Sequence, residues 1–223
     1  MSEINIEEYI YPKDFECKVC LNKFKSNFIK DRKVRLEGLD YDLFPNYLPV
    51  NPIFYEIVVC PICGYAALKN YFDKITKKEI DNYLKNITPS FKNHNYPMEI
   101  DVNIATEQYI SAYNAVCAKY GKNSEKGYLA LRISWLFKVM KNLELQKEYA
   151  KIALENFEVA ILKEDTPMMG IEFDTVNYII AAMNTVISDK SKAKKYLSDV
   201  IVSPTASKRL KDMARDLKED LGR

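Results

Sequence analysis

Histidine and glycine are scarce in this sequence, with one histidine and six glycines among 223 residues. A single histidine excludes a metal centre built from several histidines. The scattered glycines form neither a phosphate-cradling loop nor a dinucleotide-binding fingerprint. Positive and negative charges nearly balance, with 33 Lys and Arg against 31 Asp and Glu, so the overall charge points to no anionic partner.

Long apolar stretches are also missing. No run approaches the roughly 18 apolar residues of a membrane-spanning helix, so we expect no membrane association. The first residues, MSEINIEEYI, lack the basic and apolar segments of a secretory signal. We therefore expect a cytoplasmic protein. In that reducing compartment, paired cysteines favour metal binding over disulfides.

Four of the five cysteines form two Cys-x-x-Cys pairs, and the second pair lies in the run Cys-Pro-Ile-Cys-Gly. Each such turn points two sulfurs at one ion, and two turns supply the closed tetrahedral thiolate set of a structural Zn²⁺ site. Residues 21–59 separate the pairs, a longer stretch than the roughly 15–20 residues usual in this pattern. We predict one structural zinc bound by Cys17, Cys20, Cys60 and Cys63. The same four-sulfur set holds iron in rubredoxins, so electron transfer by iron stays open as an alternative.

Residues 1–73 and 74–223 carry different patterns. The first part has short β-type runs at 24–36 and 53–59, together with five of the nine prolines. Between those runs, residues 35–52 are predicted to form a long loop insert. The second part has helical periodicity throughout. The sequence thus predicts a mainly α protein, with a β-rich zinc-binding module at 1–73, zinc-ribbon or rubredoxin-like in its knuckles, followed by a helical body at 74–223.

Several helix ends can be read from the body. Thr76 and Glu79 have the spacing of a capping box, Asp101 is a helix N-cap, and Gly121 is a helix stop. Ser203 and the proline after it are predicted to open the last helix. Helices are predicted between these points at 126–140, 144–162, 173–187 and 190–202. Successive pairs with short links favour a tetratricopeptide-like array of helical hairpins, although an ordinary antiparallel bundle gives a similar pattern.

The junction between the two parts has no Gly- or Ser-rich linker. Instead, Tyr65, Leu68, Tyr71 and Phe72 recur at three- and four-residue spacing after Gly64. This spacing predicts a helix that begins just after Gly64 and packs the zinc module against the first helices of the body.

Several segments together resemble an uncharacterised bacterial family, domain of unknown function 2225. They are 17–36 around the first knuckle, the lead-in Asn-Pro-Ile-Phe-Tyr at 51–55, the second knuckle at 60–66, and the helical segments 126–155 and 203–217. The resemblance implies a zinc-ribbon or rubredoxin-like N-terminus, a tetratricopeptide-like C-terminus and no assigned activity. Many members carry a further cysteine in the insert. This chain has Asp-Tyr-Asp-Leu-Phe-Pro at 40–45 and lacks it.

A basic cluster between positions 18 and 35 contains a single acid, Asp31, and is interleaved with Phe24 and Phe28. Such a cluster can contact phosphates, which makes nucleic-acid binding an alternative function. It can equally be a solvated strand face, since acids elsewhere in the module balance it. The candidate anion-binding residues are Lys18, Lys23, Lys25, Lys30, Arg32, Lys33 and Arg35.

No catalytic residue set can be assembled from the sequence. The one pair that suggests a thiol nucleophile with its base is Cys117 and His94, and Cys117 is better explained by packing on an apolar helix face. We therefore predict an interaction scaffold rather than an enzyme, with a protein or peptide partner in the helical groove.

Overall fold

The computed structural model describes residues 5–86 and 95–222, and the chain groups into two compact units. Unit 1 is Met1–Gly38 with Pro45–Gly121, and unit 2 is Leu39–Phe44 with Lys122–Arg223. The division predicted from the sequence, a β-rich module at 1–73 and a helical body at 74–223, remains a prediction. His94 lies outside the described residues.

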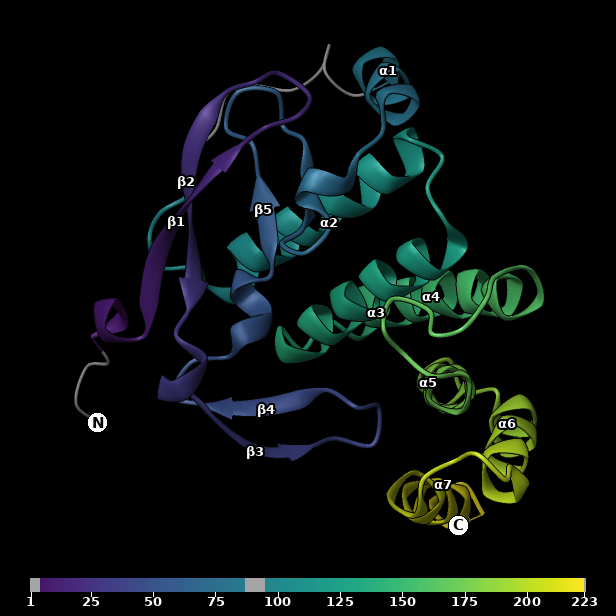
Figure 1. Ribbon diagram of the computed structural model, residues 1–223. Coiled ribbons are helices and arrows are strands. Elements are labelled where there is room, and N and C mark those ends of the chain that lie inside the picture. The colour runs from purple at the N-terminus through teal and green to yellow at the C-terminus, as the bar shows by residue number, and fades with distance from the viewer. Residues whose placement is uncertain (1–4, 87–94, 223) are drawn as a thin grey trace. The chain divides into compact units, whose positions relative to one another are not determined.

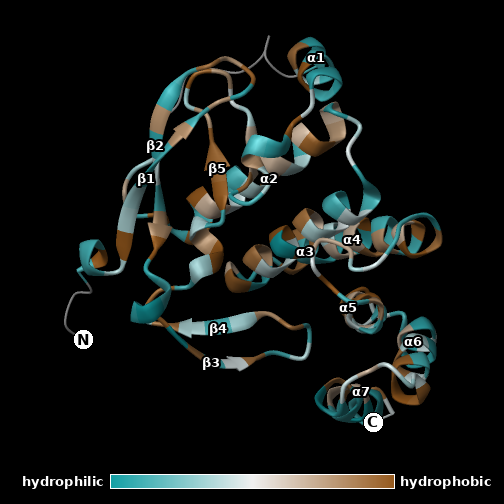
Figure 2. Ribbon diagram, viewed as in Figure 1, coloured by the Kyte–Doolittle hydropathy of each residue, from teal (hydrophilic) through white to brown (hydrophobic). Residues whose placement is uncertain are grey.

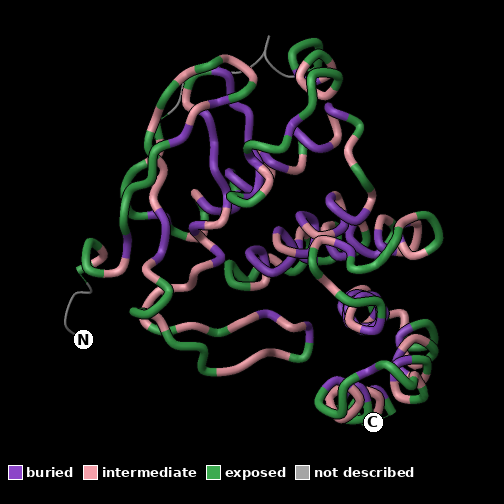
Figure 3. Tube along the Cα trace, in the orientation of Figure 1, coloured by how far each residue is buried: buried purple, intermediate pink, exposed green. Residues whose placement is uncertain are grey.

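Unit 1 is built on two antiparallel hairpins. Strand β1 (Ile10–Glu16) pairs with β2 (Lys23–Ile29), and β5 (Ile57–Val59) pairs with β6 (Ala66–Leu68). Figure 1 shows these hairpins beside the helix α2 (Val102–Ala118), on which β5 and β6 pack. Strand β5 is apolar along its whole length and fully buried, as Figures 2 and 3 show, because it forms the centre of this core.

The insert 35–52 is not the loop that we predicted. It contains the paired strands β3 (Arg35–Leu39) and β4 (Pro45–Leu48), and short 3-10 turns occur at Ile6–Glu8, Asp31–Lys33, Pro52–Tyr55 and Phe72–Lys74. The turn that allows the β3–β4 pairing is closed by Asp42, whose carboxylate accepts a hydrogen bond from the Phe44 amide at 3.2 Å. Leu43 supplies the left-handed backbone with φ 66°.

The junction after Gly64 also differs from the prediction. No helix begins there, because residues 66–68 form β6 and pair with β5. Tyr65 and the three residues of β6 are all buried, so a continuous apolar run forms a buried strand where its spacing suggested a helix. The first helix is α1 (Lys77–Asn86), and its predicted capping box is confirmed. The Thr76 amide donates to Glu79 at 2.8 Å, and the Glu79 amide donates to the Thr76 hydroxyl at 3.3 Å.

Helix α2 begins at the predicted cap, where Asp101 accepts a hydrogen bond from the Ile104 amide at 2.8 Å. Its end is not set by Gly121. The left-handed residue is Tyr120, with φ 57°, and the Gly121 amide then donates to the Val116 carbonyl. No helix among the described residues is long and apolar enough to cross a membrane.

Unit 2 is helical apart from the segment Leu39–Phe44. Its helices lie close to the predicted ranges: α3 (Asn123–Val139), α4 (Leu143–Lys163), α5 (Phe173–Val186), α6 (Lys190–Val202) and α7 (Lys208–Asp220). Each helix packs mainly on its neighbours in the sequence, as the C-terminal part of Figure 1 shows. The predicted start of α7 at Ser203 is wrong, because Ser207 caps it by accepting from the Leu210 amide at 3.2 Å.

Candidate metal centre

Each Cys-x-x-Cys pair forms the turn of one hairpin in unit 1. The first turn joins β1 to β2, and the second joins β5 to β6. In both, the residue four positions after the first cysteine donates its amide to that cysteine's carbonyl: Leu21 to Cys17 at 2.8 Å and Gly64 to Cys60 at 3.0 Å. Both donors have left-handed backbone, with φ 61° and 73°. The two knuckles therefore share one backbone geometry, and each closes its own hairpin.

The four sulfur atoms come together in one cluster. All of them lie within 4.8 Å of one another, and two pairs, Cys17–Cys63 and Cys20–Cys60, are separated by 3.6 and 3.5 Å. These distances are far longer than the roughly 2.05 Å of a disulfide bond. They are close to the edge of about 3.8 Å that a tetrahedron with Zn–S bonds of about 2.3 Å requires. The cysteines predicted from the sequence therefore fit a metal ion of this kind.

Backbone amides surround the sulfurs. Amides of Val19 and Cys20 hydrogen-bond to the Cys17 sulfur, and those of Ile62 and Cys63 hydrogen-bond to the Cys60 sulfur. Hydrogen bonds of this kind favour the thiolate form and orient the ligand. Three of the four cysteines are buried and Cys20 is half-buried, so the knuckle amides replace water around the cluster.

The thiols influence one another strongly. Hydrogen bonding with Cys17 and Cys63 lowers the pKa of Cys60 to about 2. Hydrogen bonding with Cys60 raises the pKa of Cys17 to about 12, and hydrogen bonding with Cys17 raises the pKa of Cys63. Without a cation, ionisation of Cys60 is thus favoured and that of Cys17 and Cys63 is disfavoured. A dication in the centre would compensate the negative charge and allow four thiolates.

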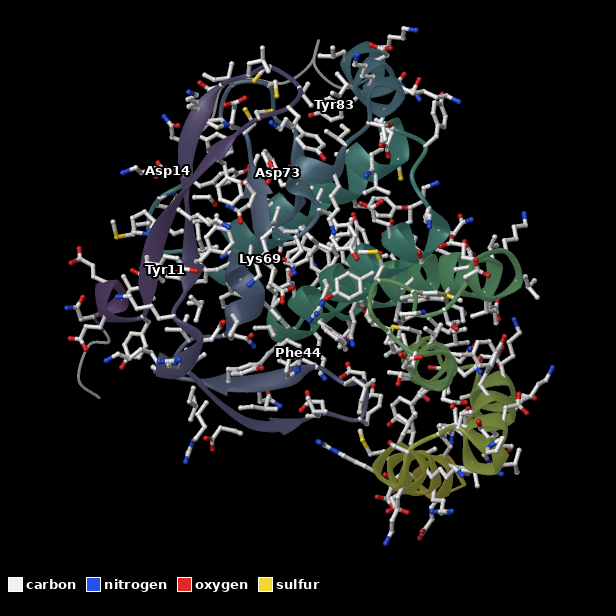
Figure 4. All side chains as sticks on the ribbon, viewed as in Figure 1. Tyr11, Asp14, Phe44, Lys69, Asp73 and Tyr83 are labelled. Atoms are coloured by element: carbon white, nitrogen blue, oxygen red, sulfur yellow. The ribbon has the colours of Figure 1, made fainter. Side chains whose placement is uncertain are left out.

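An aromatic layer that sequence analysis missed supports the second knuckle. The Tyr83 hydroxyl, on α1, donates to the Cys63 carbonyl at 3.2 Å, and Figure 4 labels this buried side chain. Its ring meets Tyr65 edge to face at 5.5 Å, and Tyr65 contacts Phe72 at 5.0 Å. Burial, together with the nearby cysteines, raises the pKa of Tyr83, so it stays a hydrogen-bond donor at neutral pH. No local sequence signal shows that Tyr83 contacts the second knuckle.

The predicted basic face is mixed in charge. The β1–β2 register places Glu16 opposite Lys23 and Asp14 opposite Lys25. Lys18 pairs with Glu16 at 3.9 Å and Arg35 pairs with Glu37 at 2.6 Å. The Lys30 ammonium donates to the carbonyls of Glu7 and Glu8 at 3.1 and 3.2 Å. Much of the local positive charge is therefore compensated by residues of unit 1. Cys117 is half-buried on α2.

A second cluster of charged side chains lies in unit 2, and it was not predicted from the sequence. Asp42 is fully buried, and both of its carboxylate oxygens accept from the Lys138 ammonium at 3.0 Å. Lys138 also donates to Asp40 at 2.5 Å. Burial raises the pKa of Asp42, although Lys138 acts in the opposite direction. Burial also works to lower the pKa of Lys138, but Asp42 and Asp40 outweigh it and raise that pKa.

The neighbours of this cluster tie the turn segment Leu39–Phe44 to two helices. The Tyr178 hydroxyl, on α5, donates to the Tyr41 carbonyl at 2.7 Å. Phe44 meets Trp135, on α3, edge to face at 5.8 Å, and Figure 4 labels Phe44. The segment thus contacts the first helix of each of the two helical hairpins α3–α4 and α5–α6.

Comparison with known proteins gives a relative and a family. An uncharacterized protein from Borreliella burgdorferi is 30% identical over 159 residues, which cover 63% of this chain and 57% of that protein. The chain therefore spans little more than half the length of this relative. No solved structure matches the chain significantly. The model of a family described as uncharacterized protein conserved in bacteria (DUF2225) matches residues 10–221, and the chain belongs to that family.

Proposed function

We propose that this protein is a cytoplasmic interaction scaffold: a tetratricopeptide-like helical unit recruits a protein partner, and one zinc ion holds the β-rich unit together. The observation that carries the proposal is the segment Leu39–Phe44, which lies against α3 and α5 as a short acidic, aromatic peptide would. A partner segment of the same chemistry fits that surface.

The packing order of the helices supports an array. In repeat proteins each helical hairpin contacts mainly its neighbours, and unit 2 follows that order from α3 to α7. Small residues let paired helices approach closely. A Cβ added at Gly127 would come within 3.1 Å of the Phe157 ring, which places α3 and α4 in close contact. In arrays of this kind the first helices of successive hairpins share one face, here α3 and α5.

The contacts of the turn segment describe the ligand that this face accepts. Asp42 meets the Lys138 ammonium, Phe44 meets Trp135, and a backbone carbonyl accepts from Tyr178. Together these combine one charge, one aromatic anchor and one main-chain hydrogen bond, the usual elements of peptide recognition. The chain's own segment then competes with the partner.

The metal has a structural role in this proposal. Four protein sulfurs complete a tetrahedral shell, so no position remains for water or substrate. Zinc would fix the two knuckles that Cys17, Cys20, Cys60 and Cys63 form. A rubredoxin-like iron in the same cluster would supply one-electron chemistry instead, and the colour of the purified protein distinguishes the two.

The test uses a labelled synthetic peptide of residues 37–46 and a variant, D42A/F44A, in which the internal segment has lost its two anchors. We expect the variant to bind the peptide in fluorescence anisotropy and the unaltered chain to bind it far more weakly. Adding K138M to the variant removes the partner of Asp42 and should weaken binding again. If the folded D42A/F44A variant does not bind the peptide, the face formed by α3 and α5 is not a peptide-binding site.

Nucleic-acid binding through the basic cluster is the competing function. The cross-strand acids and the ion pairs of Lys18 and Arg35 weaken the case for it. A labelled oligonucleotide titrated at low and high salt decides the matter. Tight binding that falls steeply with salt would favour phosphate contacts over a peptide partner.

A further inference from the structure

The strand edges of unit 1 carry backbone groups whose direction follows from the strand pairing. In an antiparallel pair, alternate residues exchange hydrogen bonds with the partner strand, and the residues between them point their N–H and C=O groups to the outer edge. The Cys17 amide donates to the Asn22 carbonyl and the Lys30 amide donates to the Tyr9 carbonyl. With the β1–β2 register, these bonds fix the alternation along the whole hairpin. Lys25 and Asn27 are therefore outward-pointing residues of β2.

Proline supports this assignment. Pro12 of β1 lies opposite Asn27 of β2 and has no N–H to donate. The pair Pro12–Asn27 is therefore one of the pairs that exchange no backbone hydrogen bonds. The outer edge of β2 thus offers two N–H and two C=O groups at Lys25 and Asn27, spaced as an added strand would need them.

Strand β5 has the same property on its outer edge. The Lys69 amide donates to the Glu56 carbonyl and the Cys60 amide donates to the Tyr65 carbonyl. These bonds flank the β5–β6 register and make Ile57 and Val59 the outward-pointing residues. Within residues 5–86 and 95–222, β2 pairs only with β1 and β5 only with β6. Among the described residues of unit 1, these two strand edges therefore have no partner strand.

Both edges line the same cavity. A cavity of about 190 Å³, here called the β2–β5 cavity, is bordered by Lys25 and Asn27 from β2 and by Ile57 and Val59 from β5. Further walls come from aromatic residues at 24, 54 and 96. All of these residues belong to unit 1, so the cavity is a property of that unit alone.

A buried carboxamide also borders the cavity. Gln108, on α2, is only 6% exposed and lines the cavity. Its one acceptor and its NH₂ donors match the C=O and N–H of a peptide unit or the carboxamide of Asn and Gln.

We propose that the β2–β5 cavity is a binding site for a short extended peptide segment of a partner protein, which enters as a strand between the two hairpins. Its backbone bonds to the edges of β2 and β5, and a peptide unit or an uncharged polar side chain meets Gln108. Among the described residues that line the cavity, Lys25 is the single charged one, so the segment is neutral or acidic at that end. This strand-addition mode is independent of the helical face in unit 2 and would hold even if that face bound nothing.

The first test needs no ligand. In amide hydrogen exchange of the zinc-loaded full chain, the inward residues Ser26 and Phe28 should be protected, while Lys25 and Asn27 exchange at least about tenfold faster. Protection of Lys25 and Asn27 equal to that of Ser26 would show that the β2 edge is already paired, and would overturn the proposal.

The second test selects ligands from a phage-displayed library of random decapeptides against the same protein. The variant N27P removes the outward N–H at a position where a proline already stands opposite, so the hairpin should fold. The variant N27A keeps that N–H. Peptides bound through the edge should lose at least about tenfold in affinity on N27P and keep affinity on N27A. They should also protect the Lys25 and Asn27 amides when bound.

The third test uses Gln108. Q108L should weaken the selected peptides, whereas Q146L, the same change at a buried glutamine of unit 2, should not. Peptides that bind N27P and Q108L as well as the unaltered chain, or a library that yields none, would overturn the assignment. Self-pairing of two chains through the β2 edge, seen as a dimer that N27P abolishes, would do the same, because the occupant would then be another copy.

Discussion

The buried ion pair of unit 2 gives the sharpest energetic prediction. Replacing Lys138 with Met leaves Asp42, which is fully buried, without the ammonium that contacts both of its oxygens at 3.0 Å. Removing one partner of a buried ion pair costs about 3–5 kcal/mol, because the remaining charge has no compensation. That is a large part of the roughly 5–15 kcal/mol that holds a typical domain folded.

The structure also supplies the probe and the controls. The chain has one tryptophan, Trp135, buried beside Phe44 in unit 2, so denaturant unfolding followed by its fluorescence reports on this unit. K151M is the control, because Lys151 pairs with Glu155 at 4.0 Å on an exposed surface and should contribute no more than about 1 kcal/mol. The double variant D42N/K138M removes both charges and should recover most of the loss.

The pH dependence follows from the same pair. Burial already raises the pKa of Asp42 above 3.8, and K138M removes an influence that lowers it. An acid whose pKa is raised in the folded state destabilises the fold once pH rises above its unfolded pKa, and this effect is absent below that value. The deficit of K138M should therefore be largest at neutral pH and smallest near pH 4. A deficit below about 1 kcal/mol at pH 7, or one that grows on acidification, would show that Lys138 does not stabilise the buried Asp42 carboxylate in this way.

Three further predictions concern unit 1. C60S should abolish metal binding and unfold the two hairpins, seen as loss of dispersed amide signals, while the Trp135 transition of unit 2 persists; an unchanged unit 1 would contradict the metal's role. Y83F should destabilise unit 1 by about 0.5–1.5 kcal/mol and speed metal loss to a chelator, because the Cys63 carbonyl loses its donor; equal chelation rates would contradict this. Burial works to raise the pKa of Glu79, but hydrogen bonds from Thr76 and the charge of Lys119 outweigh it and lower that pKa from 4.5. The stabilising effect of the Glu79 carboxylate is therefore complete above pH 4.5 and is lost as the pH falls through the lowered pKa. The E79Q variant should therefore differ from the unaltered chain above pH 4.5 and converge with it in acid.

Helix positions could be predicted from the sequence because local signals define them. The 3.6-residue period fixed α3 to α6 within a few residues, and the caps at Thr76 and Asp101 depend on side chains next to the backbone they bind. The start of α7 was less predictable, since two serines near it can both act as caps and the structure uses Ser207. Strand β6 was misread because a continuous apolar run has no period that separates a buried strand from a helix.

The metal ligands were predictable for a different reason. Cysteine pairs at fixed spacing carry the chemistry themselves, whatever the fold around them. The support of that centre was not predictable, because the contact between Tyr83 and Cys63 depends on how α1 packs on the second knuckle. The pairing of Asp42 with Lys138 joins residues 96 positions apart, and only the folded chain brings such residues together.

X-ray absorption of the purified protein measures whether Cys17, Cys20, Cys60 and Cys63 hold one metal ion. We predict one zinc per chain, with four sulfur neighbours at about 2.3 Å and no nitrogen or oxygen in the shell. An iron edge with the same sulfur shell would keep the site but change the metal. A protein without stoichiometric metal, or a shell with fewer than four sulfurs, would show that the four cysteines do not form this metal site.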